Sequence, residues 1–101
     1  MLIRITAAGE AVLAEAEDFR RFSIRFDQGA RGLEAAQGAL ARVARADGDT
    51  AWVAEAALRA LAPRGGDPDW EAGLAGMIGF ARSRGWVDDQ GGIRAHIESA
   101  G

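Results

Sequence analysis

The sequence predicts a single α+β domain that is rich in helix, with three main helices and a small antiparallel sheet formed by N- and C-terminal strands. Three observations lead to this prediction. Apolar residues recur at helical spacing through the middle of the chain, they alternate with polar residues near both ends, and glycine, proline and aspartate separate the segments. The 101 residues, 49% of them hydrophobic and 27% charged, suit one domain spanning residues 1–101.

Strands are expected near both ends of the chain. Residues 2–6 and 19–26 alternate apolar and polar side chains, and the second segment is enriched in phenylalanine and isoleucine, which favour strands. Residues 10–16 could form either a short helix, which their alanines favour, or a second strand. Residues 86–87 and 93–98 flank a turn rich in aspartate and glycine, which predicts a hairpin.

Three helices are expected between these strands, over residues 30–46, about 51–62 and 68–84. Each of these segments carries apolar side chains three or four residues apart, as one buried helical face requires. The third segment has the strongest start signal, because Asp67 can cap the helix and Pro68 suits its first position.

The composition excludes several kinds of site. Without cysteine, the chain can form neither a disulfide nor a thiolate metal site. No apolar run approaches the ~20 residues of a membrane helix and no signal peptide is recognisable, so we expect a soluble cytoplasmic protein without membrane contact. Asp47-Gly48-Asp49 superficially looks like a calcium loop, but Leu58 stands where such a loop needs glutamate. We expect no metal and no cofactor.

Residues 49–98 resemble the second half of a winged helix-turn-helix domain. The resemblance rests on the predicted order of helix, tight turn, longer helix and hairpin, and on the pattern Gly85-Trp86-Val87 followed by Gly91-Gly92-Ile93. It implies a fold whose long helix enters the major groove of DNA. Here that helix would begin Asp67-Pro68-Asp69-Trp70-Glu71, whose carboxylates would repel phosphates, and the net charge of −3 adds no attraction. The residues therefore disfavour a nucleic-acid partner and favour an adapted version that binds protein.

The third predicted helix has one unusual flank. Its bulky side chains form a stripe that we expect to face the core. Nearly opposite lies a stripe of small, uncharged residues: Ala72, Gly76, Gly79 and Ser83. Each glycine costs about 1 kcal/mol of helix propensity relative to alanine, so the presence of glycine at these positions needs a structural explanation. Such a flank permits close approach of another backbone, either from this chain or from a partner such as a second copy in a homodimer.

Trp52 is the second candidate for an interface. On the predicted second helix it would lie between Glu55 and Arg59, away from the apolar face. An exposed tryptophan is a common interface anchor. The alternative is that its ring stacks on Arg59 within the same chain.

A possible ligand pocket follows from the remaining aromatic residues. We expect Trp70, Met77, Phe80 and Trp86 to lie close together around the third helix, and Arg94 or His96 could add a polar group. His96 is the only histidine, and the alternation of residues 93–98 points it toward solvent, as an ordinary surface histidine. Phe19 and Phe22 are expected in the core.

Three functions are consistent with these observations, and no catalytic residue stands out. The first is a non-enzymatic protein-interaction module or accessory subunit, acting through the small-residue flank and Trp52 with a protein partner or with itself. The second is a nucleic-acid-binding regulator of winged-helix type. The third is a small-molecule-binding protein or enzyme that uses the apolar pocket.

Overall fold

A computed structural model of the chain describes residues 1–99. Within these residues the chain forms three helices and six strands. Their order is β1 (Leu2–Ile5), β2 (Ala11–Ala14), β3 (Ser23–Phe26), α1 (Glu34–Val43), β4 (Ala44–Asp47), β5 (Thr50–Val53), α2 (Glu55–Leu61), α3 (Pro68–Ser83) and β6 (Ile93–Ser99).

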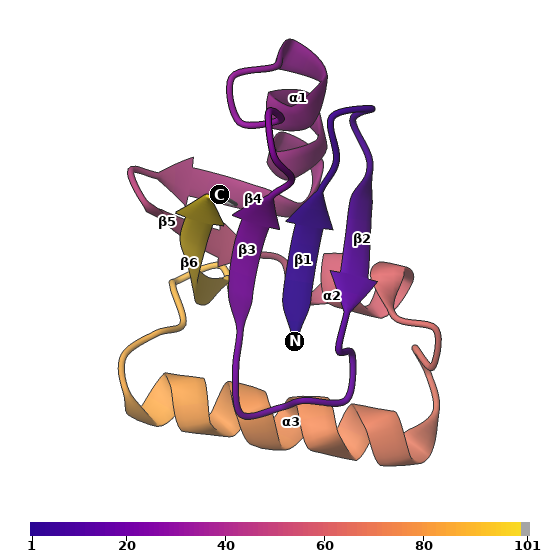
Figure 1. Cartoon of the computed structure of the whole chain (residues 1–101). Coiled ribbons are helices and arrows are strands. Elements are labelled where there is room, and N and C mark those ends of the chain that lie inside the picture. The colour runs from indigo at the N-terminus through magenta and orange to yellow at the C-terminus, as the bar shows by residue number, and fades with distance from the viewer. Residues whose placement is uncertain (100–101) are drawn as a thin grey trace.

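The six strands form one mixed sheet in the order β2-β1-β3-β6-β5-β4 (Figure 1). β3 lies parallel to β1 and to β6, whereas the other neighbouring pairs are antiparallel. The α+β class and the three helices agree with the prediction. The predicted small antiparallel sheet from the two ends of the chain is wrong, because the sheet is larger and is mixed.

The error arises mainly at residues 44–53. Helical spacing and alanine content predict helix at both ends of this segment, but the segment forms the β4–β5 hairpin instead. Gly48 takes a φ of +64° in the turn, a conformation that glycine adopts without steric cost. Ala51 and Val53 are buried, and β5 pairs with β6 over its whole length. Tertiary pairing and burial thus outweigh the small helix preference of alanine.

The other predicted elements differ from the structure mainly in their limits. The strand alternative for residues 10–16 is confirmed by β2, and the predicted third helix is confirmed by α3. Only the second half of residues 19–26 forms a strand. The predicted C-terminal hairpin is reduced to a single bridge between Val87 and Ile93, because β6 pairs chiefly with β3 and β5.

The helices cover one face of the sheet and leave the other exposed. Strand residues such as Ile3, Ile24 and Ile97 join one buried cluster with residues of all three helices. Alternate residues of the same strands, such as Arg94 and His96, are exposed, and we call their side of the sheet the open face. No side chain in the buried core of residues 1–99 is polar or charged.

The third helix runs crosswise at the end of the sheet where β1 and β3 begin, and the β2–β3 loop lies alongside it (Figure 1). Its buried face includes Trp70, Leu74 and Ile78. None of the helices in the described part of the chain is both long and apolar enough to cross a membrane.

Candidate functional site

The small-residue flank of α3 has no neighbour within the described chain. Ala72, Gly76, Gly79 and Ser83 are all exposed. A Cβ atom added at Gly76 or Gly79 would meet no atom within 4 Å. The expected packing of another part of this chain against the flank is therefore wrong, and an unpartnered stripe of small residues does not by itself indicate a partner.

A different glycine of the helix makes the close contact. A Cβ atom added at Gly73 would lie 2.3 Å from the ring of Phe19, in the β2–β3 loop. Such a distance is far below van der Waals contact, so any side chain here would require the Phe19 ring to shift. The close approach expected at the helical glycines thus occurs on a different side of the helix from the small-residue flank.

Trp52 lies on β5 rather than on a helix, and it is partly buried on the open face of the sheet. The guanidinium of Arg45, on the neighbouring strand β4, lies 5.9 Å from the centroid of its ring. The predicted partner Arg59 instead binds Glu55 at 2.6 Å and Glu71 at 2.7 Å. Trp52 thus has a stacking partner in its own chain, but a different one from the residue expected.

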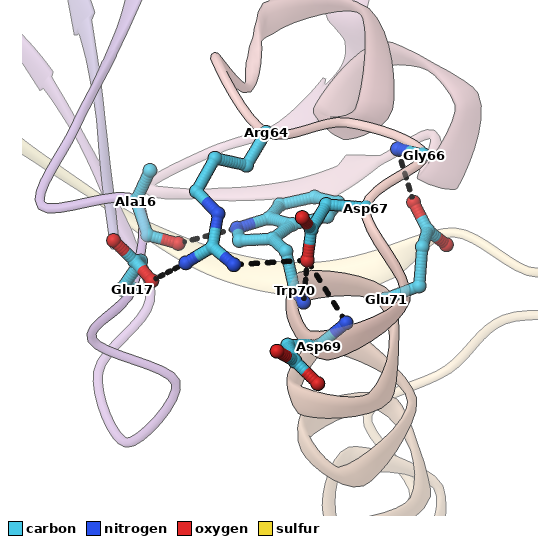
Figure 2. A network of polar contacts seen from close by, with 8 residues as sticks. All are labelled: Ala16, Glu17, Arg64, Gly66, Asp67, Asp69, Trp70 and Glu71. Atoms are coloured by element: carbon cyan, nitrogen blue, oxygen red, sulfur yellow. Dashed lines mark hydrogen bonds and ion pairs between the residues drawn. The ribbon is translucent and has the colours of Figure 1, made fainter.

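Polar contacts surround the N-terminal end of α3 (Figure 2). The Asp67 carboxylate accepts hydrogen bonds from the amides of Asp69, at 2.9 Å, and Trp70, at 3.2 Å. Arg64 donates to Asp67 at 2.9 Å and to Glu17 of the β2–β3 loop at 2.5 Å. The hydrogen bond from the Trp70 amide is the main reason why the pKa of Asp67 lies below its ordinary value, and Arg64 lowers it further. This end of the helix is capped, and Asp67 and Glu71 are paired with Arg64 and Arg59.

Trp70 belongs to the same end of the helix and is only 1% exposed. Its indole N–H donates to the Ala16 carbonyl at 2.8 Å, as Figure 2 shows, and its ring lies 6.2 Å from that of Phe19. These contacts attach the β2–β3 loop to α3. Trp70 is therefore a core residue and does not line the ligand pocket predicted to include it.

The backbone nitrogen of Met1 holds the other part of this loop. It donates to the carbonyls of Asp18 and Arg21, at 2.8 Å each. Burial lowers the pKa of this amino group. The loop segment that carries Phe19, Arg21 and Phe22 is consequently fixed between β1 and α3.

Three adjoining hollows lie beyond this loop, at the C-terminal half of α3. One of about 310 Å³ is lined by Phe19, Arg20, Gly76, Met77 and Phe80. The next, about 110 Å³, shares Phe19, Arg20, Met77 and Phe80 with the first and also touches Trp86 and Arg94. The third, about 330 Å³, lies on the open face of the sheet; its lining is Phe22, Thr50, Trp86, Arg94 and His96. We call the three together the arginine–aromatic groove.

Aromatic rings are exposed along this groove. Phe80 is 55% exposed and Trp86 is 36% exposed, and their rings meet edge to face with centroids 6.0 Å apart. The structure thus brings Met77, Phe80 and Trp86 together as expected. Phe19 and Phe22 were expected in the core, but they are only partly buried and also line the groove.

The charges of the groove are all of one sign. No carboxylate lines any of the three hollows. Within residues 1–99, no ion pair involves Arg20, Arg21, Arg84 or Arg94. The Arg84 guanidinium instead lies 5.1 Å from the Phe80 ring centroid and 6.0 Å from that of Trp86. The groove therefore combines cationic groups with exposed aromatic surface, which suits an anionic ligand that also carries apolar groups.

His96 is exposed on β6, opposite Ser23 of β3 and Thr50 of β5, which agrees with its expected direction toward solvent. No hydrogen bond to the His96 ring is found in residues 1–99 that would orient it as a general base. In the same residues, no group of three histidine or acidic side chains is placed to hold a metal ion.

Sequence reasoning missed part of this site. It identified the aromatic residues of α3 and the Trp86 segment, but it did not connect them with Arg20 and Arg21. The signal was the segment Phe19-Arg20-Arg21-Phe22, in which two arginines lie between aromatic residues. Its meaning depends on the loop lying against α3, which the sequence does not show.

The comparisons with known proteins add no family. No family model matches the chain, and no curated protein and no solved structure matches it. The resemblance of residues 49–98 to a winged helix-turn-helix domain therefore stays a prediction.

Proposed function

We propose that this chain is a non-enzymatic, cytoplasmic protein-interaction module that binds an acidic segment of a partner protein in the arginine–aromatic groove. One observation carries the proposal. Four arginines that lack an ion pair in residues 1–99 surround exposed aromatic rings, and no carboxylate lines the hollows between them. The proposal keeps the class of function expected from the sequence and places it in the groove, to which Gly76 is the one contribution of the small-residue flank.

Charge supports an acidic partner. The chain as a whole carries a net charge of −3, so the groove is a local concentration of positive charge and not part of a generally basic surface. Clusters of arginine recognise acidic and phosphorylated motifs, because the guanidinium donates several hydrogen bonds to one anionic group. Arginine and tryptophan are also the residues most often found to dominate binding energy at protein interfaces.

The shape of the groove supports a peptide over a compact ligand. The hollow bounded by Met77, Phe80 and Trp86 is about 110 Å³, below the ~300 Å³ of the smallest typical pockets for small molecules, and the other two, at about 310 and 330 Å³, only just reach that size. The three hollows instead succeed one another from Gly76 on α3 to His96 on β6. An extended chain could place successive side chains in them, which a small molecule could not.

Nucleic acid fits the surface less well. A polyanion needs many separate phosphate contacts for affinity. The neighbouring arginines of the open face do not provide them, because Arg4, Arg25 and Arg45 are paired with Asp27, Glu98 and Asp88. On the open face, the arginines without an ion pair in residues 1–99 are therefore confined to the groove.

The test is selection from a random peptide display library on the purified chain. We expect the recovered peptides to be enriched in aspartate and glutamate with intervening apolar residues. Arg94→Glu should abolish their binding, because it reverses a charge that lines two of the hollows. Arg82→Glu is the matched control: it makes the same change of net charge at an exposed arginine that forms no ion pair in residues 1–99 and lines none of the hollows.

Three results would overturn the proposal. They are recovery of no binding peptide, recovery of peptides without acidic enrichment, and equal loss of binding in Arg94→Glu and Arg82→Glu. Binding of single-stranded oligonucleotide at the groove, stronger than that of any recovered peptide and abolished by Arg94→Glu, would assign the groove to nucleic acid instead.

A further inference from the structure

The edge strand β4 presents unused backbone groups. The amide of Ala54 donates to the Val43 carbonyl at 3.0 Å, which fixes the side of the backbone that faces β5. Because polar backbone groups point alternately to the two sides of a strand, residues 45 and 47 also face β5, and Ala44 and Ala46 face outward. The Ala44 amide bonds the Leu40 carbonyl within α1. The Ala44 carbonyl and both polar groups of Ala46 are left for another strand.

The side chains of β4 are complementary to a second copy of the same strand. Arg45 and Asp47 are two residues apart, so they project from the same face of the sheet, and both are exposed. An antiparallel pair with a two-fold axis at Ala46 would place each Arg45 opposite Asp47 of the other copy. In that register Ala46 lies opposite Ala46 of the other copy, and the outward amide and carbonyl of each bond those of the other. Arg45 and Asp47 then form a non-hydrogen-bonded pair, in which side chains lie closest.

The neighbouring residues permit this pairing. Asp47 forms no ion pair within residues 1–99, so its carboxylate is available. Arg45 lies 3.2 Å from Asp88 and stacks on Trp52, which keeps its guanidinium beside the strand. A guanidinium has five N–H donors and can serve both carboxylates. Gly48, which would approach the Ala44 carbonyl of the other copy, has no side chain to obstruct it.

We propose that β4 pairs antiparallel with β4 of a second copy and joins the two six-stranded sheets into one across a two-fold axis. Charged residues usually protect an edge strand from such pairing. Here Arg45 and Asp47 instead select one register. A shift that centres the two-fold axis on Arg45 would place the two Arg45 side chains opposite each other, and their like charges would repel. The opposite edge strand β2, with the sequence Ala-Val-Leu-Ala, has no charged pair that could select a register. This proposal is independent of the groove, which involves α3 and β6.

The test is sedimentation equilibrium of two charge variants, alone and mixed. The wild-type mass should rise with concentration from 10.6 kDa toward twice that value. Asp47→Arg places arginine against arginine, and Arg45→Asp places aspartate against aspartate, so each variant alone should associate roughly tenfold more weakly. An equimolar mixture should recover the association of the wild type, because the two variants complement each other.

Several outcomes would overturn the dimer. They are a wild-type mass that stays at 10.6 kDa up to millimolar concentration, single variants that associate like the wild type, and a mixture no stronger than its components. Circular dichroism of each variant shows whether it is folded.

A cysteine variant tests the register directly, because the chain has no cysteine of its own. Residues of a hydrogen-bonded antiparallel pair lie about 5.5 Å apart between Cα atoms, a separation that a disulfide can span. Ala46→Cys should therefore give a covalent dimer on mild oxidation, whereas Ala75→Cys, exposed on α3, should not. Equal rates of crosslinking in the two variants would contradict the proposed register.

Discussion

The two ends of α3 use the same residue types in opposite ways. At the N-terminal end, Trp70 is buried with its indole N–H bonded, and Arg64 is paired with two carboxylates. At the C-terminal end, the Trp86 ring is exposed, and Arg84 and Arg94 have no carboxylate partner within residues 1–99. The first end satisfies its polar and apolar groups inside the molecule and so contributes stability. The second leaves both kinds of group available, which is what a binding surface requires.

The largest expected difference between the two ends lies between their tryptophans. Trp70→Ala should lower the free energy of unfolding by about 3–5 kcal/mol, because it removes a fully buried ring and leaves a cavity. Trp86→Ala should cost less, about 1–3 kcal/mol, since its ring is partly exposed and the variant loses its partial burial and the edge-to-face contact with Phe80. Urea denaturation of both variants measures the difference. Equal losses would show that the groove end is part of the core.

The glycines of α3 sharpen the comparison along one helix. Gly73→Ala forces a Cβ into the Phe19 ring and should destabilise by about 1–3 kcal/mol through overpacking. Gly76→Ala meets no atom within 4 Å and should stabilise by up to about 1 kcal/mol, because alanine has the higher helix propensity. Thermal unfolding of the two variants gives the sign directly. A destabilising Gly76→Ala would indicate a neighbour of the small-residue flank, such as a partner molecule.

The acid dependence of stability should depend on Asp67. Hydrogen bonds from the Trp70 and Asp69 amides hold its pKa below its ordinary value of 3.8 in the folded chain. The unfolded chain therefore binds the proton more readily, so the stabilisation is complete above about pH 3.8 and is lost as the pH falls through the folded pKa. Asp67→Asn keeps a capping side chain but removes this titration. Urea midpoints measured across the acid range should fall less steeply in the variant, whereas parallel curves would contradict this account.

The smallest effects are expected from single arginines. Arg94→Gln should change the free energy of unfolding by no more than about 0.5 kcal/mol, because the exposed guanidinium of Arg94 has no ion pair in residues 1–99 to lose. Arg64→Gln removes the link between Glu17 and Asp67 and should be the more destabilising of the two. Chemical denaturation in low salt would detect this order, and a reversed order would mean that Arg94 has a structural role.

The comparison also shows which parts of the molecule could be predicted from sequence. The capped N-terminal end of α3 could be predicted, because Asp67 and Pro68 act within one turn of the helix and need no distant partner. The β4–β5 hairpin could not be predicted, because Ala44, Ala46 and Ala51 favour helix locally, and the strand β6 that pairs with β5 lies far along the chain. Parallel pairing of β1 with β3 was equally out of reach of local patterns.

The candidate site was predicted in part for the same reason. Met77, Phe80 and Trp86 lie close in the chain, so helical spacing was enough to bring them together. Arg20 and Phe22 come from a distant loop, and only the tertiary structure adds them to the groove, whereas Arg94 and His96 were expected as its polar groups. The small-residue flank was correctly placed on the outer side of α3, but helical spacing could not show whether another backbone covers it.

The most direct test of the groove observes Trp70 and Trp86 in one spectrum. The chain gives three indole N–H signals in ¹H–¹⁵N spectra, from Trp52, Trp70 and Trp86. Assigned with Trp52→Phe and Trp86→Phe, they would be followed during titration with a short peptide that alternates glutamate and leucine. We expect the Trp86 signal to shift while that of Trp70 stays in place, and we expect no shift when glutamine replaces glutamate. A Trp86 signal that never moves, or that moves equally with the glutamine peptide, would contradict the proposal that this groove binds acidic chains.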